Sequence, residues 1–218
     1  MTAVSARSNP LTLAGGILLL LVFAAAVVAI LARHGEQPEA SVGDTTTRPD
    51  VLKAGAFEPP QAAPDFSLPG SDGSEVTLAR YRGKVVLLTF GFTYCAAVCP
   101  TTMSTLAQAR KQLGKDSDDV QVIFLTVDPA RDDAASMRTY LAAFDPTFIG
   151  ATGKPSTLAK VREKYGVTAS KQGTGSDYAM AHTSSIFMVD RKGKLRAIMP
   201  FGHQAADFVH DVRYLLAQ

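Results

Sequence analysis

The sequence contains no tryptophan, only two cysteines and almost no excess of charge of either sign. Its 22 basic and 20 acidic residues leave a formal net charge of +2, so the chain lacks the basic field that nucleic-acid binding requires. Aromatic residues make up 8% of the chain, which excludes a broad stacking surface. The hydrophobic content of 46% is ordinary for a globular protein, and no internal repeat or low-complexity tract interrupts it.

The N-terminal part carries one long run without charge, LTLAGGILLLLVFAAAVVAILA at residues 11–32. A helix needs about 20 apolar residues to cross a bilayer, whereas the apolar core of a cleaved signal peptide has about 7–15. We therefore expect an uncleaved transmembrane helix. Arg7 precedes this run and Arg33 follows it, and the sequence favours residues 1–10 in the cytoplasm. In a bacterium this topology gives a single-pass anchor in the inner membrane with the domain in the periplasm.

The rest of the chain divides into a linker and one domain. Residues 33–61 mix proline, threonine, glycine and acidic residues without apolar periodicity, which is typical of a linker that holds a domain away from the membrane. Residues 62–218 are enough for one domain with a sizeable core. The polar stretch TASKQGTGSDY within it predicts an exposed loop or hairpin excursion.

The order of expected elements in this domain indicates its fold class. The apolar runs VVLLTF at 85–90 and VQVIFLTV at 120–127 predict two strands buried on both faces. Further strands are expected at residues 66–68, 75–78, 183–189 and 195–199, and helices at residues 101–114, 132–144, 155–165 and 204–216. Strands that alternate with helices before a last hairpin and helix predict an α/β fold with a mixed sheet flanked by helices.

Both cysteines, Cys95 and Cys99, lie in GFTYCAAVCP, directly after the first buried strand and beside a helix start. In α/β sheets ligands bind at the carboxyl ends of strands, and a helix N-terminus stabilises thiolate over thiol. A structural disulfide, a redox pair and a pair of metal ligands are all consistent with this location. The spacing lets the two sulfurs reach bonding distance, although so short a loop would contribute little as a staple.

Three motifs, GFTYCAAVCPTTM, LTVDPARD and DYAMAHTSSIFMVDRKGKL, follow one another along the chain. In order and spacing they resemble the Sco/SenC family, which consists of copper-binding thioredoxin-like proteins of cytochrome c oxidase assembly. The resemblance covers residues 60–216. The family's C-x-x-x-C-P motif falls on Cys95, Cys99 and Pro100, and its metal-binding histidine falls on His182.

The chain departs from the family pattern beside these ligands. Many members have Pro-Asp after the first cysteine and Asp before the histidine, where this chain has Ala96-Ala97 and Ala181. The ligand atoms survive, but any hydrogen bonding that those acids give to the ligands is lost.

The resemblance implies a thioredoxin-like domain that binds one copper ion, Cu(I) or Cu(II), through two thiolates and one imidazole. Such soft donors suit Cu(I), and an added oxygen ligand would let the same set hold Cu(II). Zinc is the main competitor, but a closed structural zinc site would need a further cysteine or histidine nearby. The implied function is that of a metallochaperone and not a turnover enzyme. Its expected partners are the cytochrome c oxidase subunit that carries the binuclear copper site, another copper chaperone and a thiol reductase.

Two redox functions remain as alternatives. One is a thiol-disulfide reductase that maintains the cysteines of the oxidase copper site, with Cys95 and Cys99 as its redox-active pair. The other, known among relatives of the fold, is a peroxidase with one peroxide-reactive cysteine. A peroxidase needs an activating arginine near the thiolate, and the sequence places none beside Cys95. Neither redox function needs His182.

Three charged residues follow the second buried strand. Asp128 precedes a proline. It is expected either to open a turn or to contact the metal ligands without binding the ion itself. Arg131 and Asp132 are expected to start the next helix.

Residues that flank the expected ligands have roles of their own. Met180 lies two residues before His182 and is a candidate auxiliary soft donor. Phe92 and Tyr94 are expected to shield the site from water.

Overall fold

The computed structural model describes residues 51–218. The anchor expected at 11–32, residues 1–10 and most of the expected linker lie outside the described residues. Among the helices of residues 51–218, none has the length and apolar character needed to span a membrane.

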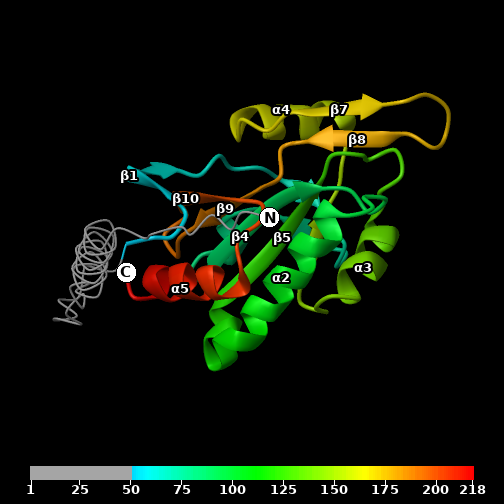
Figure 1. Cartoon of the computed structure of the whole chain (residues 1–218). Coiled ribbons are helices and arrows are strands. Elements are labelled where there is room, and N and C mark those ends of the chain that lie inside the picture. Colours follow the sequence, from blue (N-terminus) through cyan, green and yellow to red (C-terminus); the bar gives the residue numbers. More distant parts are fainter. Residues whose placement is uncertain (1–50) are drawn as a thin grey trace, which may run out of the picture. The chain divides into compact units, whose positions relative to one another are not determined.

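A six-stranded sheet forms the centre of the domain (Figure 1), in the order β1-β10-β9-β4-β5-β6. The strands are β1 (Gly55–Ala62), β4 (Val85–Gly91), β5 (Val120–Thr126), β6 (Ile149–Ala151), β9 (Ser185–Val189) and β10 (Lys194–Pro200). Strands β4, β5 and β6 run parallel, whereas β9 is antiparallel to β4, β10 to β9 and β1 to β10. These mixed directions confirm the predicted class of sheet.

Helices and a hairpin cover the sheet (Figure 1). Helices α2 (Val98–Leu113) and α5 (Ala205–Leu216) pack against each other on one face, and α3 (Ala134–Ala142) packs against β6 at the edge. Helix α4 (Pro155–Lys164) and the hairpin of β7 (Ala169–Gln172) and β8 (Ala179–His182) lie on the other side of the sheet. The remaining elements are β2 (Leu68–Pro69), β3 (Glu75–Val76) and 3-10 helices at Ala79–Tyr81 and Gly114–Asp119.

The core lies on both faces of β4 and β5, in which every residue is buried. Their apolar runs therefore confirm the two predicted buried strands. Large side chains such as Phe124 and Phe208 are almost fully enclosed. Each such side chain contributes about 1.5–3 kcal/mol relative to leaving it exposed. This packing gives a rigid base for the loops at the carboxyl ends of the strands.

Strand β1 corrects the expected linker, because residues 55–61 belong to the sheet and not to a tether. Its side chains are mostly exposed and it contains consecutive prolines, so it shows no strand periodicity. Proline is tolerated because β1 is an edge strand, which needs fewer backbone donors. The segment before it is held by Asp211 of α5, whose carboxylate accepts hydrogen bonds from the N–H groups of Lys53 (2.7 Å) and Ala54 (2.9 Å).

Two smaller differences concern local patterns. Strand β6 was not expected, since three residues are too few to show a period. Helix α2 begins at Val98, before the expected start at residue 101. The hydroxyls of Thr101 and Thr102 donate to the carbonyls of Ala97 and Val98 within the first turn. The polar stretch at 168–178 forms β7 and the turn that leads to β8, as the hairpin interpretation predicted.

Candidate metal centre

The cysteine loop connects β4 to α2 and places both sulfurs at the start of the helix. Cys99 lies in the first turn of α2, and its N–H donates to Cys95 Sγ at 3.4 Å. The N-cap residue of this helix, Ala97, makes no side-chain hydrogen bond. The sulfur of Cys95 therefore accepts a helix N–H group as a capping side chain would. Both this hydrogen bond and the helix dipole favour a thiolate at Cys95.

The two thiols, both free, differ in burial and hence in pKa. Partial burial raises the pKa of Cys95, but hydrogen bonds from the N–H groups of Cys99, Ala97 and Val98 and from the Cys99 thiol outweigh it. The pKa of Cys95 therefore lies below its ordinary value. Burial raises the pKa of Cys99 far above its ordinary value, and a hydrogen bond from the backbone of Phe92 offsets only part of that effect. The pair thus combines an ionisable, accessible thiol with a protonated, buried one.

Gly91, the last residue of β4, lets the buried thiol approach the strand closely. A Cβ atom at this position would lie 3.0 Å from Cys99 Sγ and 2.6 Å from the ring of Phe124. Real Cβ atoms essentially never come that close to a buried ring, so a larger residue would push the sulfur or the ring away. The close packing of Cys99 therefore depends on glycine at this position.

His182 comes to the thiols from the end of β8. Its Nε2 lies 3.6 Å from Cys99 Sγ, and its Nδ1 lies 3.0 Å from the carbonyl oxygen of Thr183. A carbonyl only accepts hydrogen bonds, so Nδ1 carries the proton and the lone pair of Nε2 faces the sulfur. The ring of Phe92 packs edge-on against the imidazole, with 5.8 Å between centroids.

Cys95, Cys99 and His182 form one cluster in which a ligand atom from each lies within 4.8 Å of the others. The fold thus brings together the three residues that the sequence predicted as metal ligands. A small cavity of about 10 Å³ lies beside Cys99 and His182, roughly the space of one water-sized sphere. Two sulfurs and one imidazole nitrogen are soft donors suited to Cu(I), and zinc accepts the same set.

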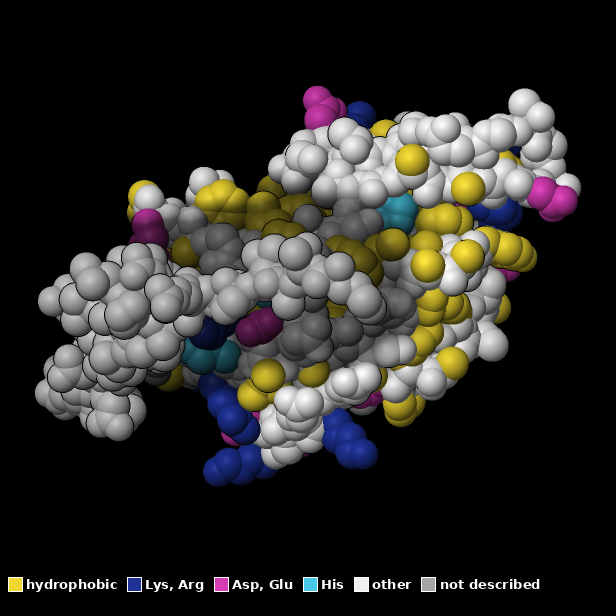
Figure 2. Space-filling view, viewed as in Figure 1, with side chains coloured by type: hydrophobic (Ala, Val, Ile, Leu, Met, Phe, Trp, Pro, Cys, Tyr) yellow, Lys and Arg dark blue, Asp and Glu magenta, His cyan; other side chains and the backbone are white. Residues whose placement is uncertain are grey.

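The segments that carry the ligands supply apolar and uncharged polar side chains to the surface. Residues 85–109 and 178–189, which carry the three ligands, contain no charged side chain. Figure 2 shows hydrophobic side chains gathered on the surface below the β7–β8 hairpin. Phe92 is buried against His182, as the shielding prediction requires, whereas Tyr94 is 65% exposed. Met180 shares one face of β8 with His182, since alternate residues of a strand point the same way.

The turn after β5 corrects the expectation that Arg131 and Asp132 start a helix, because α3 begins only at Ala134. Asp132 is fully buried and accepts hydrogen bonds from the hydroxyls of Thr93 and Thr126, both at 2.6 Å. It also accepts one from the N–H of Thr93 at 3.2 Å. Burial raises its pKa, and these hydrogen bonds only partly offset the rise. A buried carboxyl needs such partners, which explains why it joins two loops and does not cap α3.

Arg131 reaches the cysteine loop, which sequence reasoning missed. Its guanidinium carbon lies 5.9 Å from the ring centroid of Phe92, 4.8 Å from that of Tyr94 and 3.7 Å from that of Tyr178. Its Nε donates to Asp128 Oδ2 at 2.5 Å, so the positive charge is paired with a carboxylate. The sequence does contain a signal for this contact. The DPARD motif follows β5, and the carboxyl end of β5 lies beside that of β4, from which the cysteine loop begins.

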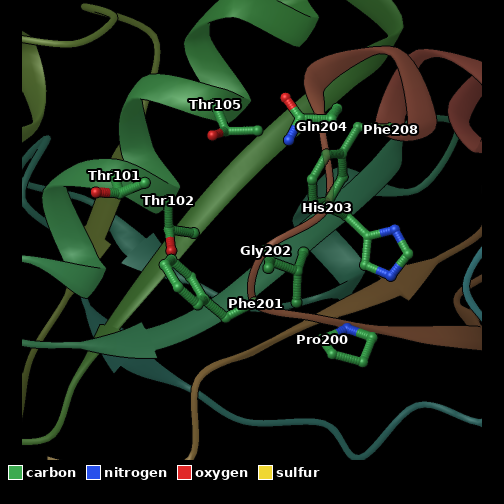
Figure 3. A pocket seen from close by; sticks show the side chains of 10 residues that line it. Thr101, Thr102, Thr105, Pro200, Phe201, Gly202, His203, Gln204 and Phe208 are labelled. Atoms are coloured by element: carbon green, nitrogen blue, oxygen red, sulfur yellow. The ribbon is translucent and has the colours of Figure 1, made fainter. Parts of the chain in front are cut away.

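A second hollow, of about 170 Å³, lies between the start of α2 and the turn after β10 (Figure 3). Thr101, Thr102 and Thr105 line it from α2, and Phe201 and His203 line it from the turn. Thr102 also lines the small cavity beside the buried thiol. Thr102 therefore separates the hollow from the small cavity beside Cys99 and His182.

The difference between the thiols predicts selective alkylation. In the reduced protein at neutral pH, iodoacetamide should modify Cys95 at least about 10-fold faster than Cys99, because the thiolate is the nucleophile and Cys99 is protonated and buried. Since the pKa of Cys95 is lowered, its reaction should remain fast below the pH at which an ordinary thiol becomes protonated. Peptide mass mapping of a time course measures both rates. Equal rates in the folded protein would contradict the assignment.

Comparison with known proteins gives a family match over most of the chain. The SCO1/SenC family model matches residues 55–217. The mitochondrial protein SCO2 homolog of Mus musculus is 33% identical over 157 residues, which cover 70% of this chain and 62% of the mouse protein. The chain thus spans about three fifths of that relative's length.

Two solved structures share the fold. ScoI of Bradyrhizobium japonicum with copper bound is 36% identical, with a TM-score of 0.66 over 71% of this chain and 99% of the other. Apo Sco1 of Thermus thermophilus is 35% identical, with a TM-score of 0.70 over 78% and 99%.

Proposed function

Because the chain belongs to the SCO1/SenC family, we propose that it is a metallochaperone that delivers copper to the binuclear copper site of cytochrome c oxidase. It binds one copper ion through Cys95, Cys99 and His182. The observation that carries the proposal is the placement of their ligand atoms within 4.8 Å of one another. The similarity to a ScoI structure that contains copper supports copper over zinc as the ion.

The three residues contribute differently to holding the ion. Cys99 supplies a buried sulfur fixed by the packing of α2 on β4, and Cys95 supplies a sulfur at the surface. Two thiolates are sufficient for Cu(I), whereas the nitrogen of His182 adds the harder donor that Cu(II) favours. Binding requires the Cys99 thiol to lose its proton, so loading releases protons and weakens as the pH falls. Copper is the cargo of this site.

The test is copper stoichiometry of the full-length protein in detergent. We expect one copper per reduced chain, and none after both cysteines are replaced by serine. Zinc competition in the same assay distinguishes the two metals, and zinc that displaces copper at equal concentration would contradict the proposal.

A thiol-disulfide reductase is the second candidate, and the inequality of the thiols favours it. An accessible thiol of lowered pKa, Cys95, beside a buried thiol, Cys99, suits attack on a disulfide followed by resolution. This function requires a reversible Cys95–Cys99 disulfide but not His182. The peroxidase has less support, because the nearby Arg131 is already paired with Asp128.

We further propose that residues 11–32 anchor the protein in the bacterial inner membrane, with the domain in the periplasm. The support is the length of that uncharged run. The protein should stay in the membrane fraction at full length, and protease added to spheroplasts should digest the domain. A domain that survives this treatment contradicts the orientation, and a shortened soluble form contradicts the anchor.

A further inference from the structure

We propose that the turn at residues 128–132 is a positioning element that holds His182 against the two thiols. Arg131 of the turn and Tyr178 of the hairpin make the contact between the two segments, and we call this pair the joint. This inference rests on the proposed copper function. None of these residues belongs to the ligand cluster. They act by connecting the two segments that carry the ligands, which are far apart in the sequence.

The first connection runs from the turn to the cysteine loop. Asp132 accepts hydrogen bonds from the N–H and the hydroxyl of Thr93, which lies two residues before Cys95. The hydroxyl of Thr126, the last residue of β5, donates to the same carboxyl. Asp132 itself is fully buried, so its carboxyl depends on these bonds, and they fix the turn relative to the cysteine loop.

The second connection runs from the turn to the hairpin. The hydroxyl of Tyr178 donates to Asp128 Oδ1 at 2.7 Å, and Nη1 of Arg131 donates to the carbonyl of Tyr178 at 3.0 Å. The guanidinium lies over the ring of Tyr178 at 3.7 Å. Nη2 of Arg131 is buried and lacks a hydrogen-bond partner among the described residues, so ring contacts take the place of one. Both ends of Tyr178, backbone and hydroxyl, are thereby held.

The hairpin needs such a connection because it is not part of the central sheet. Within residues 51–218, strands β7 and β8 pair only with each other. At the base, the N–H of Thr183 donates to the carbonyl of Thr168 at 3.1 Å. Tyr178 directly precedes Ala179, the first residue of β8, whereas His182 is its last residue. The short strand that carries His182 is therefore held at both ends, and its inward face is kept toward the sulfurs.

Loss of the joint should lower the fraction of time for which Nε2 of His182 faces the thiols, without removing any ligand. Partners that orient a metal-binding histidine typically contribute about 10–100-fold in metal affinity. The effect should fall on Cu(II), which depends on the imidazole nitrogen more than Cu(I) does. It should also disappear when the histidine itself is absent.

The experiment compares Arg131→Met with the parent in the full-length protein, using Cu(II) and Cu(I) competition titrations. We expect Cu(II) affinity to fall about 10-fold and Cu(I) affinity to change less than about 3-fold. Hydrogen exchange of the metal-free protein should show faster exchange in residues 179–182. Tyr178→Phe, which removes only the hydroxyl bond to Asp128, is the milder second variant and should shift Cu(II) affinity in the same direction. Lys171→Met is the matched control, because Lys171 lies over the same ring at 3.8 Å and is itself exposed.

A double-mutant cycle with His182→Ala decides the matter. The inference requires that Arg131→Met has no further effect on Cu(II) once His182 is gone. An equal loss with and without His182, or no loss in either joint variant, would overturn the positioning role. If His182→Ala itself leaves Cu(II) affinity unchanged, the proposed ligand set fails instead, so the two failures are distinct.

Discussion

The Cys95→Ser variant is expected to lose copper affinity by more than about 100-fold, because losing a ligand should exceed the 10–100-fold effect of an outer partner. Serine offers a neutral, hard hydroxyl in place of a soft thiolate, and the remaining pair of one sulfur and one imidazole nitrogen holds Cu(I) less tightly than two thiolates do. Its oxygen can still accept the N–H of Cys99 at the start of α2, so the fold should survive. Copper titration together with thermal unfolding measures both effects.

Oxidation of the same pair provides a test without mutation. A Cys95–Cys99 disulfide removes both thiolates, and the oxidised chain should bind no copper until it is reduced. If the oxidised and reduced forms bind copper equally well, the cysteines are not the ligands. If Cys95→Ser loses its fold together with copper binding, the comparison of the oxidised and reduced forms decides whether the cysteines are ligands.

The His182→Ala variant should separate the two oxidation states of copper. Removal of the imidazole leaves two thiolates that still hold Cu(I), so that affinity should fall less than about 10-fold, whereas Cu(II) affinity should fall more than about 100-fold. The fold should stay intact because His182 is only half-buried and ends a strand outside the central sheet. Competition titrations and the absorption spectrum of the Cu(II) form measure the difference.

The same variant distinguishes the chaperone from the reductase. Attack of Cys95 on a generic disulfide depends on thiolate character and access, so His182→Ala should change that rate little. Cytochrome c oxidase assembly should nevertheless decline. If the variant assembles oxidase normally while Cys95→Ser does not, the reductase is the function of this chain.

The sequence predicts those elements whose own residues show a recognisable apolar pattern. Strands β4 and β5 are continuous apolar runs, and a strand buried on both faces needs no other information. Strand β1 could not be recognised in this way, because its side chains are mostly exposed. Its residues form a strand through their pairing with β10. For β6 the information lies in its parallel pairing with β5, which three residues do not encode by themselves.

In the site, the ligand residues could be predicted from sequence motifs, whereas the contacts that orient them become known only from the fold. Cys95, Cys99 and His182 were predicted from the resemblance, and the fold brings them together. The direction of the imidazole depends on the carbonyl of Thr183, and the meeting of Arg131 with Tyr178 depends on where the hairpin folds back. Such contacts link residues distant in the sequence through tertiary packing, which no periodicity records.

Under the proposed function, the absence of charge from residues 85–109 and 178–189 affects how a recipient protein meets the copper site. Long-range attraction between opposite charges accelerates encounter and is weakened by salt. The ligand-bearing segments supply no ionic side chain for such steering, and the charge of the adjacent Arg131 is paired with Asp128. Under the proposed function, we therefore expect copper transfer to depend more on the fit of the two surfaces than on ionic strength.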